Sequence, residues 1–118
     1  MLEIQILPLA RRDLKSIGVF TARKFGTDQA KRYLQGLGRE IQRLSSHPEL
    51  GTQCEEIRPG YRYLHVQRHL VFYRAQAHRI EIVRVLHDAM DAAAHLRERE
   101  DQVNVSATRR KWKGASRS

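Results

Sequence analysis

Arginine and histidine side chains between residues 58 and 87 are the ones in this sequence that could carry chemistry. A metal-independent ribonuclease needs one group to abstract the 2′-OH proton, one to protonate the leaving oxygen, and cations to stabilise the phosphorane. The candidates for these roles are His87, His69, Arg58, Arg62 and Arg74. A small basic domain brings some such pairs to a common face by chance, so these residues permit ribonuclease chemistry without requiring it.

Other kinds of catalytic site find little support in the sequence. Neither G-x-x-x-x-G-K-[ST] nor G-x-G-x-x-G occurs, so a cradle for nucleotide phosphates is not indicated, and no G-x-S-x-G surrounds a serine. Six scattered histidines and the single Cys54 do not have the spacing of a structural zinc site. His87 with Asp88 and Asp91 is a thin metal set, because either aspartate also suits a helix start. We therefore predict no metal and no cofactor.

The formal charge of +9 is spread unevenly along the chain. Residues 1–100 contain 17 Lys/Arg against 12 Asp/Glu, and residues 101–118 contain 5 against 1. A positive surface field favours either nucleic acid or an acidic protein partner, and charge alone does not choose between them. The basic cluster around Trp112 could form an arm that stacks on bases, or it could be a flexible terminus or an expression remnant.

Length and composition indicate one domain. A chain of 118 residues with 41% hydrophobic residues supports one two-layer core, which we place at residues 1–97, followed by a basic tail at 98–118. A lone cysteine fits a reducing cytosol, and no run of 18 apolar residues or signal peptide is found. We expect a cytoplasmic protein that does not span a membrane.

The N-terminal third predicts a strand and a helical hairpin. Residues 2–7 alternate apolar and polar side chains with the period of a strand, and Pro8 suits the first turn of a helix. Apolar stripes then follow helical spacing, with Gly26 between the helices, Thr27 or Asp28 as the second cap, and His47-Pro48 as its end. The stripes are Ala10, Leu14, Ile17, Thr21 and Lys24/Phe25 in the first helix, and Ala30, Leu34, Leu37, Ile41 and Leu44 in the second.

The following third predicts a sheet. Strands are expected at 56–57 or 61–66, at 69–75 and at 79–86, with turns at 67–68 and 76–78. Strict alternation would put Ile80, Ile82 and Arg84 on one face and Glu81, Val83 and Val85 on the other. Both faces are partly apolar, so we expect the hairpin on one side and residues 88–96 on the other. The fold class is therefore α+β, an antiparallel sheet packed against an N-terminal helical hairpin.

Three sequence blocks between residues 55 and 91 carry a family resemblance. E-E-I-R-P-G-Y-R-Y, R-H-L-V-F-Y-R and I-E-I-V-R-V-L-H-D-A-M-D resemble, in order and spacing, the C-terminal half of ParE-type toxins of bacterial toxin-antitoxin modules. The A-x-x-D-L segment at 10–14 agrees in kind, and the resemblance covers about residues 2–97. It implies the RelE-like fold, with the order β-α-α-β-β-β.

The resemblance also implies a function. The protein would be a non-enzymatic toxin that acts on DNA gyrase and is neutralised by a cognate ParD- or PaaA-like antitoxin, whose C-terminal segment wraps it. Relatives of the RelE type instead cleave mRNA on the ribosome, often with a C-terminal Tyr or His. Here no tyrosine follows Tyr73, whereas His87 keeps that alternative open. A homologue that binds antitoxin but has lost toxicity is a third possibility, and direct nucleic-acid binding would be secondary.

Two residue sets follow from the resemblance and the predicted surfaces. The antitoxin would contact Leu14, Ile17, Phe20, Arg58, Arg62 and Arg74. The target would contact Arg84, His87, Met90 and Leu96. Gly36 and Gly38 either allow close approach of a partner helix or have no special role.

Overall fold

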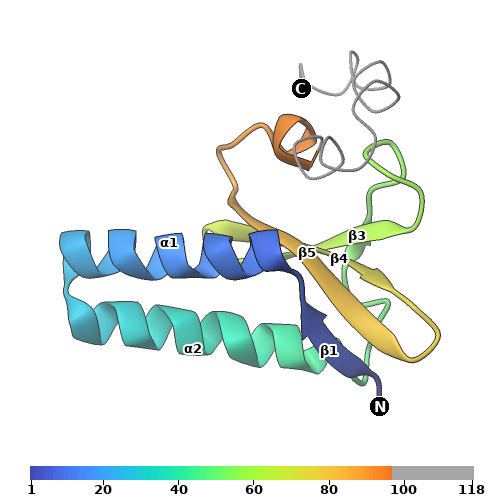
Figure 1. Cartoon of the computed structure of the whole chain (residues 1–118), viewed down its shortest axis with the longest axis horizontal. Coiled ribbons are helices and arrows are strands. Elements are labelled where there is room, and N and C mark those ends of the chain that lie inside the picture. Colours follow the sequence, from blue (N-terminus) through green and yellow to red (C-terminus); the bar gives the residue numbers. More distant parts are fainter. Residues whose placement is uncertain (97–118) are drawn as a thin grey trace.

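The computed structural model describes residues 1–96, which form a helical hairpin and one sheet (Figure 1). A helical turn at 92–96 follows the last strand, and the predicted basic tail lies outside the described residues. The order confirms the predicted β-α-α-β-β-β arrangement and adds a two-residue strand. The elements are β1 (Glu3–Ile6), α1 (Pro8–Phe25), α2 (Thr27–Arg43), β2 (Thr52–Gln53), β3 (Tyr61–Val66), β4 (His69–Ala75) and β5 (Arg79–His87).

The hairpin forms as its apolar stripes predict. Pro8 occupies the first turn of α1, and Gly26, with φ of 97°, separates the two helices. Gly26 is also the N-cap of α2, which has no side-chain cap hydrogen bond, so the predicted capping by Thr27 or Asp28 is wrong. The helix ends at Arg43, before His47, because tight turns follow it.

The sheet has the order β1-β5-β4-β3-β2. Strands β2 to β5 are antiparallel neighbours, whereas β1 is parallel to β5, with Ile4 opposite Ile80. The predicted antiparallel sheet therefore carries one parallel edge strand. The cause is topological, because the whole chain between β1 and β5 intervenes and no tight turn joins them.

A bulge in β5 changes the predicted faces. Phe72 of β4 lies opposite Arg84, but the next residue, Tyr73, lies opposite Ile82, so Val83 is the extra residue. Strict alternation, which placed Arg84 on the same face as Ile82, is therefore wrong beyond Val83. Arg84 shares the face of Phe72 instead.

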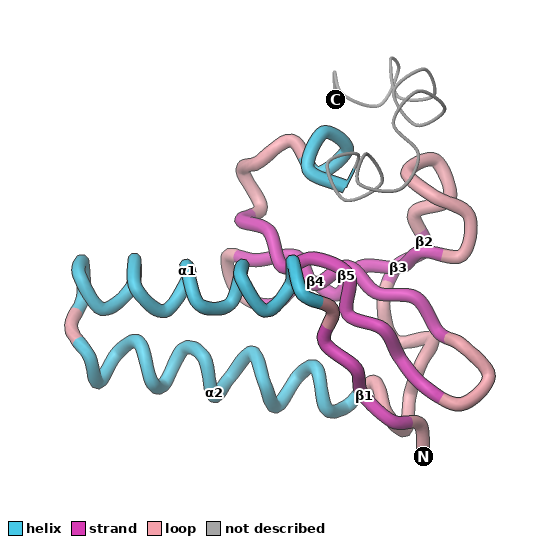
Figure 2. Tube along the Cα trace, viewed as in Figure 1, coloured by secondary structure: helices cyan, strands magenta, loops and turns pink. Residues whose placement is uncertain are grey.

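The core has two layers, one on each face of the sheet. The hairpin covers one face, and loop residues 54–57 and the turn at 92–96 cover the other, as Figure 2 shows. The first layer includes Ala10, Ile17, Leu37, Ile41, Leu44, Val71, Tyr73, Ile80, Ile82 and Val85. The second includes Leu7, Cys54, Tyr61, Phe72, Val83, Leu86 and Leu96. No helix within residues 1–96 has the length and apolar character needed to cross a membrane.

Candidate functional site

Arg62, on β3, holds the preceding loop in place. Its Nη1 donates hydrogen bonds to the carbonyl oxygens of Gly51 at 2.7 Å and Glu49 at 3.3 Å. Tyr73 secures the same loop, because its hydroxyl accepts a bond from the N–H of Gly51 and donates one to the carbonyl of Pro48. The guanidinium of Arg62 is therefore engaged by the protein itself.

Arg74 and Arg79 both bind one buried carboxylate. The Nε of Arg74 lies 2.6 Å from Oε1 of Glu81, and the Nε of Arg79 lies 3.0 Å from Oε2. Burial of Glu81 raises its pKa, but the two arginine hydrogen bonds and charges outweigh burial, so the pKa lies below the ordinary value. This triad neutralises a charge inside the fold.

Arg84 is buried, which corrects its predicted role as a target contact. Its side chain is 5% exposed, because the bulge turns it toward the face of the sheet that carries Phe72 and is covered by residues 54–57 and 92–96. There Nε and Nη2 donate to the two carboxylate oxygens of Asp13 at 2.7 and 2.9 Å, and Nη1 donates to the carbonyl of His95 at 2.9 Å. Arg84 therefore joins α1 to the C-terminal segment.

Arg58 lies in a turn, so the prediction that it belongs to the sheet is wrong. Residues 55–60 form successive turns in which the N–H groups of Ile57 and Arg58 both donate to the carbonyl of Cys54. The alternative strand at 56–57 is likewise not formed. Arg58 is half-buried at this turn.

Two histidines, His69 and His87, come together at one end of the sheet. The Tyr33 hydroxyl lies 2.6 Å from Nδ1 of His69, and the rings of His69 and His87 make an edge contact with centroids 5.4 Å apart. Burial, followed by the neighbouring His87, lowers the pKa of His69, which favours the neutral ring. Nδ1 of His87 accepts the N–H of Ala89 at 3.0 Å.

The proposed ribonuclease set is not assembled as a whole. His69 and His87 are neighbours, but Arg74 is five residues along β4 from His69, a separation of about 16 Å in an extended strand. Arg62 pairs with Tyr73 toward that same distant end of β4. The structure thus brings two histidines together without the arginines that were predicted to act with them.

The apolar candidates divide between core and surface. Ile17 and Leu96 are buried at 8% and 2% exposure, and Leu14 is partly buried against the core. Phe20 and Met90 are exposed. Ile17 and Leu96 therefore have a role in packing, which corrects the prediction that they contact a partner directly. Phe20, Met90 and the half-buried His87 remain accessible.

The positive charge of the described residues resides on the hairpin, which the focus on sheet arginines missed. Residues 8–43 contain nine Lys/Arg and three Asp/Glu, whereas the remainder of 1–96 contains six and seven. We define the basic hairpin face by its exposed cations without a carboxylate partner among the described residues. They are Arg11, Lys15 and Arg23 on α1, and Lys31 and Arg39 on α2. In the sequence, the spacings of four and eight residues between these cations already indicate that each row lies along one side of its helix.

An apolar cluster lies at the far end of the hairpin from the sheet. We define the hairpin tip as Phe20 and Phe25, whose exposed fractions are 60% and 62%. The ammonium of Lys24 lies about 6 Å from both phenylalanine rings. Phe20 was expected to contact a partner, whereas the prediction that Phe25 belongs to the buried stripe of α1 is wrong.

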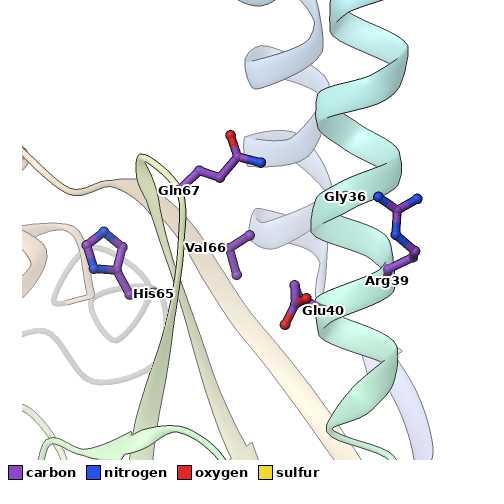
Figure 3. A pocket seen from close by; sticks show the side chains of 6 residues that line it. All are labelled: Gly36, Arg39, Glu40, His65, Val66 and Gln67. Carbon is purple, nitrogen blue, oxygen red and sulfur yellow. The ribbon is translucent and has the colours of Figure 1, made fainter.

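A shallow hollow of about 300 Å³ lies between α2 and the β3–β4 turn (Figure 3). Its lining is mostly polar, and a Cβ added at Gly36 would make only an ordinary contact, 3.8 Å from Nη2 of Arg39. A Cβ added at Gly38 would have nothing outside its own helix turn within 4 Å, whereas one added at Gly18 would lie 3.0 Å from Cδ1 of Leu34, between the helices. The lining residues are Gly36, Arg39, Glu40, His65, Val66 and Gln67. Among residues 1–96, no group of three or more His, Cys, Asp or Glu side chains could hold a metal ion.

Comparison with known proteins assigns the chain to a family. Residues 4–92 match the family model described as the ParE toxin of the type II toxin-antitoxin system parDE. The chain belongs to the ParE toxin family. Toxin ParE1 of Mycobacterium tuberculosis is 42% identical over 90 residues, which cover 75% of this chain and 92% of the relative. Toxin ParE1 of Caulobacter vibrioides is 40% identical over 87 residues, covering 74% and 90%.

A solved structure supports the ParE fold. The chain described as the chromosomal ParDE TA system from P. aeruginosa superposes with a TM-score of 0.66, at 21% identity, over 74% of this chain and 96% of that one. The chain therefore belongs to the ParE toxin family by sequence and has the fold of a chain from a ParDE system. The matched region, 4–92, contains the hairpin and the whole described sheet except Glu3, the first residue of β1.

Proposed function

We propose that this ParE-family toxin inhibits DNA gyrase in the cytoplasm and is neutralised by direct binding of a ParD- or PaaA-like antitoxin. The family match over residues 4–92 carries the proposal. Two surfaces support a protein-binding role without catalysis: the exposed hairpin tip, and the exposed residues that follow β5. Arg62 and Arg74, two of the three arginines predicted for ribonuclease chemistry, are engaged within the fold.

The hairpin tip is the surface we assign to the antitoxin. Phe20 and Phe25 together with Lys24 offer apolar contact beside positive charge, which suits an acidic amphipathic segment. Such a segment would order on binding and cover the toxin surface. Leu14 and Ile17 would support α1 beneath this surface through packing, whereas Arg62 and Arg74 hold contacts of the sheet and its loops away from the tip.

The antitoxin contact is tested by substituting Phe20→Gln and measuring affinity for the cognate antitoxin by calorimetry. We expect a loss of at least about tenfold, because truncating an exposed aromatic anchor commonly costs more than 1 kcal/mol. Met90→Gln, at an exposed apolar position away from the tip, serves as the control. Equal affinities for both variants would contradict the assignment.

The segment after β5 is the surface we assign to the target. His87 is half-buried and Met90 is 46% exposed, while Arg84 and Leu96 beneath them fix the segment by their buried contacts. Purified gyrase should lose supercoiling activity when the toxin is added, and the antitoxin should restore it. Undiminished supercoiling at large toxin excess would refute gyrase inhibition.

A second candidate, ribosome-dependent mRNA cleavage, is kept because His69 and His87 are in contact. Programmed ribosomes should then be cut at the A site by the purified protein, and His87→Gln should abolish cutting while the far-ultraviolet spectrum stays unchanged. Retained growth arrest in cells that express His87→Gln would favour gyrase inhibition instead. Cells that grow normally after induction of the parent chain would indicate a homologue that is no longer toxic.

A further inference from the structure

We infer that the basic hairpin face binds the phosphate backbone of duplex DNA. This activity goes beyond the proposed function, since gyrase inhibition and antitoxin binding do not require it. The observation that supports this inference is the uneven distribution of charge: residues 8–43 contain nine Lys/Arg against three Asp/Glu, and the rest of 1–96 has no positive excess.

The first row of cations runs along α1. Arg11, Lys15 and Arg23 are exposed at spacings of four and eight residues, on the side of the helix opposite the buried Ile17. Twelve residues of helix rise about 18 Å, a length over which duplex DNA carries roughly ten phosphate charges. Three cations in this row can therefore each meet a different phosphate.

The second row lies on α2. Lys31 and Arg39 are exposed and separated by eight residues, with exposed Gln35 between them. The buried residues Leu37 and Ile41 point the other way, into the core. Since α1 and α2 pack side by side, as Figure 1 shows, the two rows form one broad surface rather than isolated charges.

The cations of this face are available to a ligand. Arg62, Arg74, Arg79 and Arg84 are bound within the fold, but no ion pair engages Arg11, Lys15, Arg23, Lys31 or Arg39 among residues 1–96. Of the acids on the hairpin, Asp13 is bound to Arg84 and Glu40 to Arg43. Asp28 is the exposed carboxylate that remains, at the start of α2.

The composition of this face favours DNA over a protein ligand. Protein interfaces have an apolar centre, and the apolar residues of the hairpin are concentrated at its tip, in Phe20 and Phe25. Between the cations lie Gln35, Gly38 and a single apolar side chain, Val19. Cations among small and polar residues are typical of surfaces that contact phosphates and not bases.

The test is fluorescence anisotropy of a labelled duplex of about 30 base pairs with the full chain, between about 50 and 200 mM salt. Five phosphate contacts would weaken affinity about 500-fold over that range, following a slope of about −0.9 for each contact. The triple variant R11Q/K15Q/R23Q should flatten the slope by about 2.7. R11K/R23K, which keeps both charges, should bind like the parent chain.

Two controls separate this face from other positive charge. Arg79→Gln removes an exposed cation at the start of β5, outside the hairpin, and should leave the salt slope nearly unchanged. The variant R109Q/R110Q/K111Q/K113Q neutralises the basic cluster near the C-terminus. Binding that is lost in this second variant but unchanged in R11Q/K15Q/R23Q would overturn the inference.

The outcome is distinguishable from failure of the proposed function. If R11Q/K15Q/R23Q keeps its DNA affinity but loses antitoxin affinity, the face binds an acidic protein and the inference is wrong, while gyrase inhibition is untouched. If the parent chain binds DNA through this face but leaves supercoiling undiminished, the inference stands and the proposed target is wrong. An affinity too weak to detect at about 50 mM salt would also overturn it.

Discussion

Asp13 of α1 and Arg84 of β5 form a two-point ion pair, with Oδ2–Nε and Oδ1–Nη2 distances of 2.7 and 2.9 Å. Asp13 also accepts the backbone N–H of Val85 at 2.9 Å. The pairing of β1 with β5 ends at Ile82, so the N–H of Val85 lies beyond the part of β5 that β1 covers. One helix carboxylate thus continues the polar contacts of the sheet edge and neutralises a buried guanidinium.

Asp13→Asn should strongly destabilise the fold. The substitution leaves Arg84, which is 5% exposed, as a buried cation without its charged partner, and breaking such a pair typically costs about 3–5 kcal/mol. Urea unfolding followed by circular dichroism measures this free energy. Asp28→Asn, at an exposed position of α2, should change it by less than about 0.5 kcal/mol, and similar losses in both variants would contradict the role of the pair.

Two glycine substitutions should have opposite effects on stability. Gly38→Ala lies on an exposed helix surface with no atom within 4 Å of the added Cβ, so it should stabilise by about 0.5–1 kcal/mol. Gly51→Ala would place its Cβ 2.7 Å from the carbonyl oxygen of Tyr63 and from the Tyr73 ring, so it should destabilise. Thermal unfolding midpoints give the comparison. A stabilised Gly51→Ala variant would mean that the loop held by Arg62 relaxes freely.

Cys54 should be nearly inert in the folded protein. Burial, followed by the neighbouring Glu56 and Glu55, raises the pKa of its thiol to about 12, which lowers the thiolate fraction at neutral pH about a thousandfold. A thiol-reactive dye should label the native chain far more slowly than the same chain in denaturant. Rapid labelling without denaturant would show that residues 54–57 open readily.

The helices and main strands could be predicted because their signals are local. The stripe through Leu37 and Ile41 and the alternation through Val71 and Tyr73 state which side of each element is buried, and the structure agrees. Pro8 and Gly26 likewise mark the helix boundaries by backbone chemistry. Packing required no information from distant residues at these positions.

The arginines could not be assigned from sequence because their partners are remote. Arg84 was predicted to be a surface contact, but its partner Asp13 is 71 residues away, and the bulge that turns Arg84 inward gives no signal in a run of apolar residues. Arg62 similarly binds carbonyl oxygens, which every residue possesses and no sequence pattern marks. The family resemblance gave the function class, whereas the roles of these side chains required coordinates.

Glu81 should make stability depend on acid pH. Burial alone would raise its pKa, but hydrogen bonds from Arg74 and Arg79 hold the pKa below its ordinary value in the folded state. A carboxyl whose folded pKa is depressed stabilises the protein above its unfolded pKa, and this contribution is lost as the pH falls through the folded value. The free energy of unfolding, measured from about pH 6 to pH 3, should therefore fall less steeply below about pH 4.5 in Glu81→Gln than in the parent chain.

Glu3→Gln, on the exposed side of β1, should keep the parent slope, because Glu3 has no arginine partner among the described residues. Parallel curves for Glu81→Gln and the parent chain would show that the two arginines hold this carboxylate no more strongly than water does.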